Sequence, residues 1–408
     1  MALEVTATLT DPDLLFLPWN QPLEQWAPEV TVALPRGISR HVVRFVRVNG
    51  VVYAIKEAEG YYAHREYRLL GDLGRRGAPC VDPVAVVDGR KSDSGEPIPP
   101  ALITAHLQFS LPYRALYSTT LRPDTARRLL DALALLLVRL HLLGFMWGDC
   151  SLSNTLFRRD AGAFAAYLVD AETGELHDSL TDGQRGYDLE QAVTHVCGEL
   201  LDLEIGGRLH PSIDPVATGG ELLGRYQRLW SAVTEPVVVR QGERWRIDER
   251  VRALNDLGFD IAEITVTQDD AGDRIVVSPK VVDAGHHARR LLRLTGLDVE
   301  ENQARRLLND LDGYRVALEL PPTDEELVAH RWMSEVFEPV VTAIPRDLRG
   351  KLEPAEVFHQ VLEHRWFVSE REQSDIGLER AAQLYVRDVL TTRPDEKAIL
   401  DLGGLASG

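Results

Sequence analysis

The sequence contains few cysteines and no arrangement that would bond them or place them on a metal. The three cysteines, Cys80, Cys150 and Cys197, are odd in number, far apart in the chain and at no spacing typical of metal ligands. Neither a disulfide framework nor a zinc site is therefore indicated. Reduced thiols and a cytoplasmic location fit this cysteine usage best.

An excess of basic charge and a long apolar run are also missing. The 408 residues carry a formal net charge of -18, which argues against a main role in binding nucleic acid or an anionic membrane. The most apolar segment, residues 129–147, is interrupted by Asp131, Arg139 and His141. The N-terminus has no basic region followed by an apolar stretch, so we expect neither a membrane span nor export.

Lysine is the third scarce feature. The 45 basic residues include only five lysines, so the other 40 are arginines, and Lys56 is the only lysine in the first ninety residues. The compact ammonium of lysine and the planar fork of arginine are not interchangeable. In a chain that so strongly favours arginine, Lys56 is therefore a candidate functional residue.

The apolar spacing predicts an α+β architecture in the first half of the chain. Asn49-Gly50 between two β-branched runs indicates a hairpin. The spacing and the turn signals predict strands at 30–34, 42–48, 51–55, 84–87, 101–104, 155–157 and 166–169, and helices at 62–73, 125–143 and 189–203. Pro123-Asp124 marks the start of the second helix and Gly144 its end. The pattern is a β-rich N-terminal lobe with one helix, followed by a mainly helical lobe.

A boundary is expected between residues 230 and 242. Beyond it, the pattern favours a helix over 249–257, a hairpin of residues 261–267 and 274–277, and helices in the remainder. We therefore predict three parts: an N-terminal lobe over 1–105, a helical lobe over 106–235, and a mainly helical C-terminal domain with a β-hairpin over 236–408.

Two segments supply residues suited to phosphoryl transfer, which needs a cation on the phosphates, oxygen ligands for Mg²⁺ and a carboxylate near the attacking hydroxyl. Lys56 ends the apolar strand of the hairpin, and Glu66, on the helix ten residues on, could hold its ammonium. For Lys56 alone, a solvated strand end is an equally good account.

The stronger signal is the run Gly148-Asp149-Cys150-Ser151-Leu152-Ser153-Asn154. An Asp and an Asn five residues apart on a loop can place one oxygen at a substrate hydroxyl and another on a metal. Asp170, at the end of the strand that follows, is suited to bridging Mg²⁺ to the phosphates. The alternative reading is a set of capping and turn residues.

With these residues in order, residues 30–230 resemble the protein-kinase-like superfamily, and within it the lipopolysaccharide-kinase-like and small-molecule-kinase branches, whose catalytic loop reads Gly-Asp. The resemblance implies a two-lobed kinase fold that uses ATP and Mg²⁺. It implies that Lys56 contacts the phosphates, that Glu66 is its helix partner, that Asp149 is the catalytic base, and that Asn154 and Asp170 are magnesium ligands.

The resemblance also implies residues that contact the nucleotide. The segment from Leu102 to His106, including Thr104, would form the hinge that meets adenine. Asp188 would brace the catalytic loop from the next helix, unless it is only a helix N-cap. The phosphate-covering turn has a single glycine, so Arg36, Gly37 and Arg40 are the candidates for holding the phosphates there, through backbone amides or arginine side chains.

Three departures separate the chain from regulated eukaryotic-type protein kinases: the single-glycine turn, Trp147 where many kinases have histidine, and Asp170-Ala171-Glu172 where they have Asp-Phe-Gly. The second half, with segments such as 283–291 and 362–370, resembles an uncharacterised bacterial C-terminal domain found fused to such kinases. The arginine-rich usage is compatible with a bacterial origin. His286, His287, His364 and Trp366 could suggest a ligand site there, but packing is the better explanation.

The leading expectation is thus an ATP- and magnesium-dependent kinase that phosphorylates a hydroxyl of an unidentified acceptor, either a small molecule or a protein. The alternative is a nucleotide-binding pseudokinase or scaffold that presents the C-terminal domain to a partner protein. A third hypothesis is a kinase fold that transfers another part of the nucleotide, such as the adenylyl group.

Overall fold

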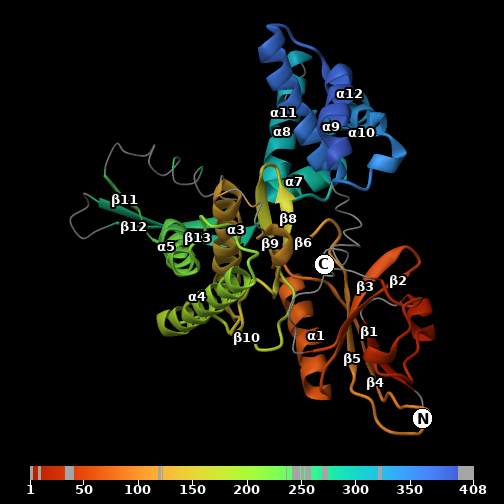
Figure 1. The fold of residues 1–408 in the computed structure, drawn as a ribbon. Coiled ribbons are helices and arrows are strands. Elements are labelled where there is room, and N and C mark those ends of the chain that lie inside the picture. The colour runs from red at the N-terminus through yellow and green to blue at the C-terminus, as the bar shows by residue number, and fades with distance from the viewer. Residues whose placement is uncertain are drawn as a thin grey trace. The chain divides into compact units, whose positions relative to one another are not determined.

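The computed structural model describes residues 3–7, 11–32, 41–117, 121, 123–235, 237–240, 249, 252, 259–268, 274–319 and 324–393. These residues form two compact units (Figure 1). The first unit holds the chain to Arg158 and from Ala166 to Tyr226. The second unit holds residues from Gln227 onward, together with Arg159–Ala165.

The first unit contains a five-stranded antiparallel sheet in the order β1-β4-β5-β3-β2. Its strands are β1 (Glu4–Ala7), β2 (Val43–Val48), β3 (Val51–Glu57), β4 (Pro83–Asp88) and β5 (Ala101–Ala105). Asn49 and Gly50 both have positive φ, of 49° and 83°, as a two-residue hairpin turn requires. The predicted hairpin is confirmed, and so is the pair β4 and β5. The strand β1 was not predicted, and of the strand predicted at 30–34 only the first three residues are described, where Val32 makes a single bridge to Phe45.

Strand alternation gives the sheet two different faces. Tyr53 and Ile55 of β3 are buried in one apolar core with Trp19 and Trp26, whose rings meet edge to face at 5.3 Å. These tryptophans belong to the segment that carries the short 3-10 helices η1 (Pro12–Phe16) and η2 (Leu23–Gln25). Side chains of adjacent residues point to opposite faces of a strand, so Lys56 faces the other way.

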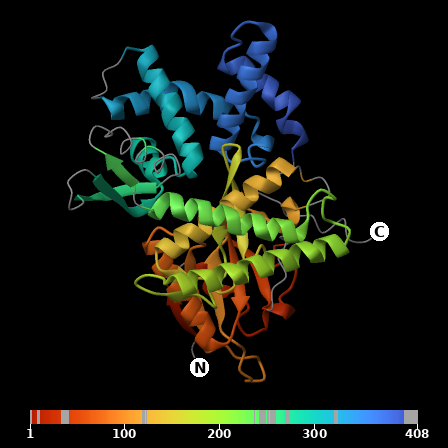
Figure 2. The same cartoon turned by 90° about the vertical axis from the view of Figure 1, so that its left-hand side faces the viewer.

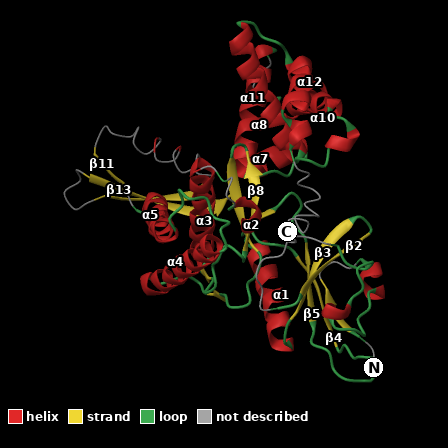
Figure 3. Cartoon of the chain, viewed as in Figure 1, coloured by secondary structure: helices red, strands yellow, loops and turns green. Residues whose placement is uncertain are grey.

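Helix α1 (Gly60–Arg75) packs against β4 and β5 (Figure 3). Glu66 is one of the buried residues of this helix. The helix begins close to the predicted start. The elements that follow are β6 (Leu111–Pro112), α2 (Tyr113–Leu116), α3 (Pro123–Leu142), β7 (Phe145–Met146), β8 (Thr155–Asp160), β9 (Ala163–Leu168), β10 (Glu175–Leu176), α4 (Asp182–Ile205) and α5 (Pro215–Thr234). The short strands form two small sheets, β6-β8-β9 and β7-β10.

Helix α3 ends where its sequence predicted. Gly144 follows it with φ of 79°, and a Cβ at this position would lie 2.1 Å from the carbonyl oxygen of His177. Only glycine fits both the left-handed backbone and this close approach. The helix is strongly apolar, yet across the described ranges no helix is both long and apolar enough to cross a membrane.

Helix α4 is the longest helix of the described chain (Figure 2) and begins seven residues before its predicted start at Leu189. Thr181 is its N-cap: the side chain of Thr181 accepts from the backbone N–H of Gln184, and the side chain of Gln184 accepts from the backbone N–H of Thr181. This capping box is visible in the sequence as Thr-x-x-Gln. The apolar spacing alone did not reveal it, because the first turn of the helix is polar.

The second unit combines a three-stranded sheet with a helical core. The strands β11 (Val237–Arg240), β12 (Phe259–Gln268) and β13 (Arg274–Ala284) pair in the order β11-β13-β12, so the predicted hairpin is confirmed and is longer than expected. The helix expected at 249–257 lies almost entirely outside the described residues. The helices are α7 (His286–Thr295), α8 (Glu301–Ala317), α9 (Glu325–Trp332), the π-helical turn η3 (Met333–Phe337), α10 (Glu338–Ala343), η4 (Arg346–Leu348), α11 (Pro354–Glu372), α12 (Leu378–Asp388) and η5 (Leu390–Thr392).

An aromatic cluster lies at the centre of this helical core. The rings of Trp332, Phe337 and Phe358 have centroids 5.2 to 5.7 Å apart, and all three are buried. The indole N–H of Trp332 donates to Asp310, so burial leaves no polar group of this ring unsatisfied. The α+β fold with a mainly helical C-terminal part is as predicted.

Asp160, the last residue of β8, caps a helix of the second unit. Its carboxylate accepts from the backbone N–H groups of Asn302 and Gln303 and from the side-chain amide of Asn302. These N–H groups lie in the first turn of α8, where no intrahelical acceptor exists. Asp160 therefore caps the N-terminus of α8 although it lies 142 residues before Asn302 in the sequence. Burial raises its pKa to about 6.

Asp160→Ala should loosen α8 by removing the acceptor of three donors. We expect the opening free energy of the α8 amides to fall by about 2 kcal/mol, as measured by hydrogen exchange of the full chain. Asp298→Ala is the matched control, since Asp298 is exposed and also lies just before α8. Equal exchange in the two variants would contradict the cap.

Asp160→Asn separates the charge from the cap, because asparagine keeps one acceptor oxygen and does not titrate. The pKa of Asp160 in the folded chain is above its value of 3.8 in the unfolded chain, so the folded state binds the proton more tightly. The wild type should therefore lose stability relative to Asp160→Asn as the pH rises from about 4 to about 6. Urea unfolding across this range measures the difference.

Candidate active site

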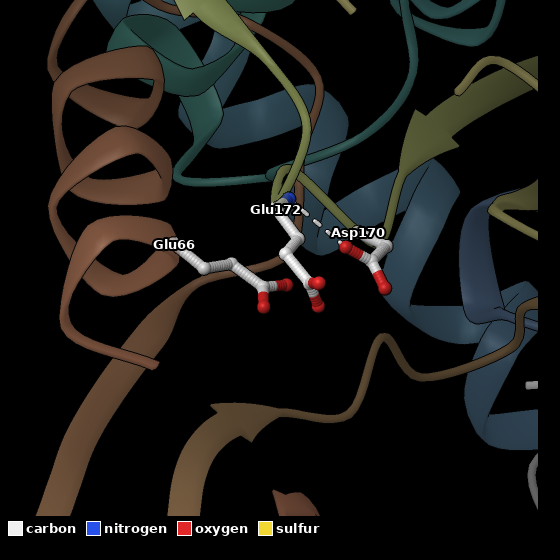
Figure 4. A group of neighbouring side chains, drawn as sticks. All are labelled: Glu66, Asp170 and Glu172. Carbon is white, nitrogen blue, oxygen red and sulfur yellow. Dashed lines mark hydrogen bonds between the residues drawn. The ribbon is translucent and has the colours of Figure 1, made fainter. Parts of the chain in front are cut away.

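One lysine ammonium lies among three carboxylates that come from distant parts of the chain. Lys56 Nζ, on β3, is 3.0 Å from Glu66 Oε2, on α1. The same nitrogen is 2.6 Å from Asp170 Oδ2 and 3.0 Å from Glu172 Oε2, in the segment after β9. Figure 4 shows Glu66, Asp170 and Glu172 with their carboxyl groups turned toward one another. The sequence predicted Lys56, Glu66 and Asp170, and the fold brings all three together.

Burial of the cluster shifts the pKa values of its charged groups. The side chain of Glu66 is 2 % exposed and that of Lys56 is 11 % exposed. Burial, reinforced by the charge of Asp170, raises the pKa of Glu66 to about 8. Burial alone would lower the pKa of Lys56, but the carboxylates outweigh it and raise that pKa. Lys56 is therefore a permanent cation in a site with excess negative charge.

The segment from Asp170 to Glu175 is tied down by its backbone. Arg65 of α1 donates to the carbonyl oxygens of Glu172 and Gly174, and the N–H of Glu172 donates to Asp170 Oδ1. The side chain of Glu172 also lies 2.8 Å from His41 Nε2. Sequence reasoning quoted Glu172 only as a departure from the kinase pattern; the structure makes it the third carboxylate on Lys56.

The loop after β7 holds Asp149 and Asn154 in mutual contact. Asn154 Nδ2 donates to the carbonyl oxygen of Asp149 at 3.0 Å and to its Oδ2 at 3.1 Å. The Asn154 amide is thereby oriented with its nitrogen on Asp149, which leaves its Oδ1 for another partner. The two residues lie on one loop, as predicted, and the structure adds that they are hydrogen-bonded to each other.

Asp188 of α4 holds the start of this loop. It is fully buried and accepts from the backbone N–H groups of Trp147 and Gly148 at 2.8 and 2.7 Å, and from His141 Nε2 at 2.9 Å. The expected brace is confirmed. The alternative, a helix N-cap, is wrong because Thr181 occupies that position.

Two further side chains of α4 reach the loop, and the sequence gave no indication of either. Glu199 accepts from the backbone N–H groups of Leu152 and Ser153, at 2.7 and 3.1 Å, and burial raises its pKa. His195 Nδ1 lies 3.2 Å from Asp149 Oδ1 and 3.3 Å from the carbonyl oxygen of Cys150. Their spacing on α4 was visible, but only the fold shows what that face meets.

The indole of Trp147 replaces the histidine of many kinases. It is fully buried, and its Nε1–H donates to the carbonyl oxygen of Asp170 at 2.7 Å. The carbonyl oxygen of Trp147 in turn accepts from the hydroxyl of Thr173 at 2.9 Å. The loop and the 170–175 segment are thus bonded to each other through this residue.

Cys150, next to Asp149, is fully buried and has no exposed sulfur. Burial, with the charge of Asp188 as the next cause, raises the pKa of this thiol well above its usual value. A buried thiol that stays protonated is a poor nucleophile. Cys150 therefore acts as an apolar packing residue.

A cavity of about 570 Å³ opens beside these groups. All of its described lining residues except Gly198 have polar side chains, and none of them is a lysine or arginine. Its described lining residues are His41, Asp149, Ser151, Ser153, Asn154, Asp170, Glu172, Thr173, Thr194, His195, Gly198, Glu199 and Asp202. Three of the predicted site residues, Asp149, Asn154 and Asp170, thus share one open space.

The other residues predicted to contact the nucleotide either lie outside the described residues or do not line the cavity. Arg36, Gly37 and Arg40 lie outside the described residues. Thr104 and His106 are described but do not line the cavity. The ring of His106 meets Phe45 edge to face at 5.5 Å, burial lowers its pKa to about 4, and its backbone N–H already donates to Val52. A hinge contact to adenine here would have to use carbonyl oxygens or side chains.

The aromatic and histidine residues of the second unit do not form a metal-type cluster. His287 pairs with Glu301 at the start of α7, while the ring of His364 packs against Tyr385. Trp366 is exposed and meets Phe367 edge to face. Within the part of the chain that the structure describes, the group with metal-type spacing is Glu66, Asp170 and Glu172.

A strand lysine held by a helix glutamate, an Asp-Asn loop and a strand-end aspartate together define a protein-kinase-like fold. Residues 46–195 match the model of the lipopolysaccharide kinase (Kdo/WaaP) family, and residues 228–390 match a domain of unknown function, DUF4032. The predicted likeness is confirmed: the chain joins a kinase-like segment to an uncharacterised domain, and the match supports a phosphotransferase of kinase type.

One solved structure among those that match is WaaP in complex with acyl carrier protein. It shares 16% sequence identity, and the match covers 63% of this chain and 99% of that one with a TM-score of 0.35. A TM-score this low supports no inference, so the fold assignment rests on the topology above and on the family match. No protein with a curated description matches the chain.

Asp188→Ala should destabilise the first unit by about 3 kcal/mol or more, because it leaves buried donors of Trp147, Gly148 and His141 without an acceptor. Thermal unfolding of the full chain, with hydrogen exchange at Trp147 and Gly148, measures the effect. Asp202→Ala, an exposed position on the same helix, is the control. If both variants unfold like the wild type, Asp188 is not the brace.

Proposed function

We propose that this protein is a magnesium-dependent kinase that transfers the γ-phosphate of ATP to a hydroxyl group. The observation that carries the proposal is the convergence on Lys56 of Glu66 and Asp170, from segments 10 and 114 residues away, beside a loop where Asp149 and Asn154 are bonded to each other. The match of residues 46–195 to a kinase family supports it.

The charges of the site support the proposal that a metal ion takes part. Three carboxylates surround one ammonium, and a triphosphate would add further negative charge. Asp170, Glu172 and the amide oxygen of Asn154 are hard oxygen donors, which is the ligand type that Mg²⁺ prefers. This donor set fits Mg²⁺, whose charge, when bound, would neutralise the phosphates.

Lys56 would exchange part of its carboxylate contacts for phosphate oxygens, with Glu66 keeping the ammonium in place. Asp149 would accept the proton of the acceptor hydroxyl as that oxygen forms its bond to the γ-phosphorus. The bond from the γ-phosphorus to the β,γ-bridging oxygen breaks, and ADP leaves. Trp147 and Asp188 would keep the loop that carries Asp149 at a fixed distance from Asp170.

The acceptor is a hydroxyl compound, either a small molecule or a protein. The cavity beside Asp149 has a volume of about 570 Å³, and all of its described lining residues except Gly198 have polar side chains. A cytoplasmic location, inferred from the cysteine usage, is part of the proposal. The hinge contacts of Thr104 and His106 and the phosphate contacts of Arg36, Gly37 and Arg40 also belong to it.

Asp170→Ala tests the nucleotide site. It should weaken MgATP binding at least about tenfold, equivalent to ~1.4 kcal/mol, because the variant lacks a metal ligand. Calorimetric titration of ATP with and without Mg²⁺ measures this, with Asp178→Ala, an exposed aspartate outside the cavity, as the control. No binding to the wild type would exclude both the kinase and the pseudokinase hypotheses.

Asp149→Asn tests the chemistry separately. It should leave MgATP affinity within about twofold of wild type and lower turnover by about a thousandfold, because a general base contributes of this order. ADP release from MgATP, with water as the acceptor, is the assay that needs no known acceptor. MgATP binding to the wild type, with release of ADP no faster than from Asp149→Asn, would favour the nucleotide-binding pseudokinase instead.

A further inference from the structure

Three side chains on one face of α4 contact successive parts of the loop that carries Asp149. Asp188, His195 and Glu199 are spaced by seven and four residues, which places them on the same side of a helix. They meet the loop in chain order: Asp188 holds 147–148, His195 lies against 149–150, and Glu199 holds 152–153. His195 is thus the middle of three contacts, and it alone reaches a side chain of the proposed machinery.

The neighbours of His195 determine where its proton lies. Its Nδ1 is close to two oxygens, Oδ1 of Asp149 at 3.2 Å and the carbonyl oxygen of Cys150 at 3.3 Å. A carboxylate and a carbonyl can only accept, so Nδ1 must carry a hydrogen and donate it. Nε2 makes no hydrogen bond within the described chain, and the ring lines the cavity with its side chain 32 % exposed.

Each carboxylate oxygen of Asp149 is therefore in contact with a side-chain nitrogen. Its Oδ1 faces His195 Nδ1 and its Oδ2 accepts from Asn154 Nδ2 at 3.1 Å. Contacts from two different elements, Asn154 on the loop and His195 on α4, restrict the plane of the carboxylate.

We infer that His195 is the positioning residue of Asp149, with its Nδ1–H holding the carboxylate in the orientation that proton transfer requires. This inference rests on the proposed function, because it assigns a role within that reaction. His195 acts on the rate of transfer and not on MgATP binding, since it contacts the base and none of Lys56, Asp170 or Glu172. Small errors in the position of a reacting group cost rate and leave binding intact.

Three variants of His195 test whether the hydrogen-bond donor at the position of Nδ1, and not the rest of the imidazole ring, is what the reaction needs. His195→Asn places an amide N–H close to the position of Nδ1, His195→Gln places its amide deeper, near the position of Nε2, and His195→Ala removes both. The assay is ADP release from MgATP with water as the acceptor, giving kcat and KM, together with MgATP titration and thermal unfolding of the full chain. His210→Ala, a histidine that does not line the cavity, is the matched control.

We expect His195→Ala and His195→Gln to lower kcat by roughly tenfold or more with KM for MgATP within twofold, and His195→Asn to restore kcat to within about threefold of wild type. Unchanged kcat in His195→Ala would overturn the inference. Equal losses in all three variants, or a loss of MgATP affinity parallel to kcat, would overturn it too. If wild type and Asp149→Asn release ADP equally slowly, the proposed function itself fails, which is a different result.

Discussion

The site depends on one buried ammonium that must not be left without counter-charge. The side chain of Lys56 is mostly buried, and an unpaired charge would be costly there. Three carboxylates contact its ammonium, one from α1 and two from the segment after β9. These contacts hold the strand, the helix and the segment at a fixed separation. Burial, together with the charge of Asp170, raises the pKa of Glu66, which favours the protonated form of this carboxyl group.

A second constraint fixes the loop relative to that ammonium. Asp188 and Glu199 present carboxylates to backbone N–H groups at 147–148 and 152–153, so the loop is supported on both sides of Asp149 by a single rigid helix. Trp147 extends this support to Asp170 through its indole N–H. The chemistry we propose thus relies on side chains whose own rotamers are fixed by hydrogen bonds, which is the usual requirement for precise placement.

Much of this could be predicted because the signals are local. Asn49-Gly50 fixes a hairpin by turn geometry, and the lysine at the end of that hairpin, the glutamate ten residues on and the Asp-Asn loop stand at recognisable spacings. Glu172, His195 and Glu199 could not be recognised in the same way. Their roles come from long-range packing, and an acidic or histidine residue on a helix is ordinarily solvated.

The misses in secondary structure have equally specific causes. The start of α4 was missed because the Thr181–Gln184 capping box precedes a polar first turn, and β1 is too short and too exposed to show alternation. The π-helical turn η3 between α9 and α10 was not predicted, since one extra residue per turn leaves no clear pattern in the sequence.

The contact of Asp160 with α8 joins the two segments of the chain that match different family models. Asp160 lies inside the segment that matches the kinase family, yet it completes a helix of the segment that matches the domain of unknown function. A recombination event that exchanged either segment alone would leave the first turn of α8 without its acceptor. The first turn of α8, in the segment of unknown function, therefore depends for its hydrogen bonds on a residue of the kinase-like segment.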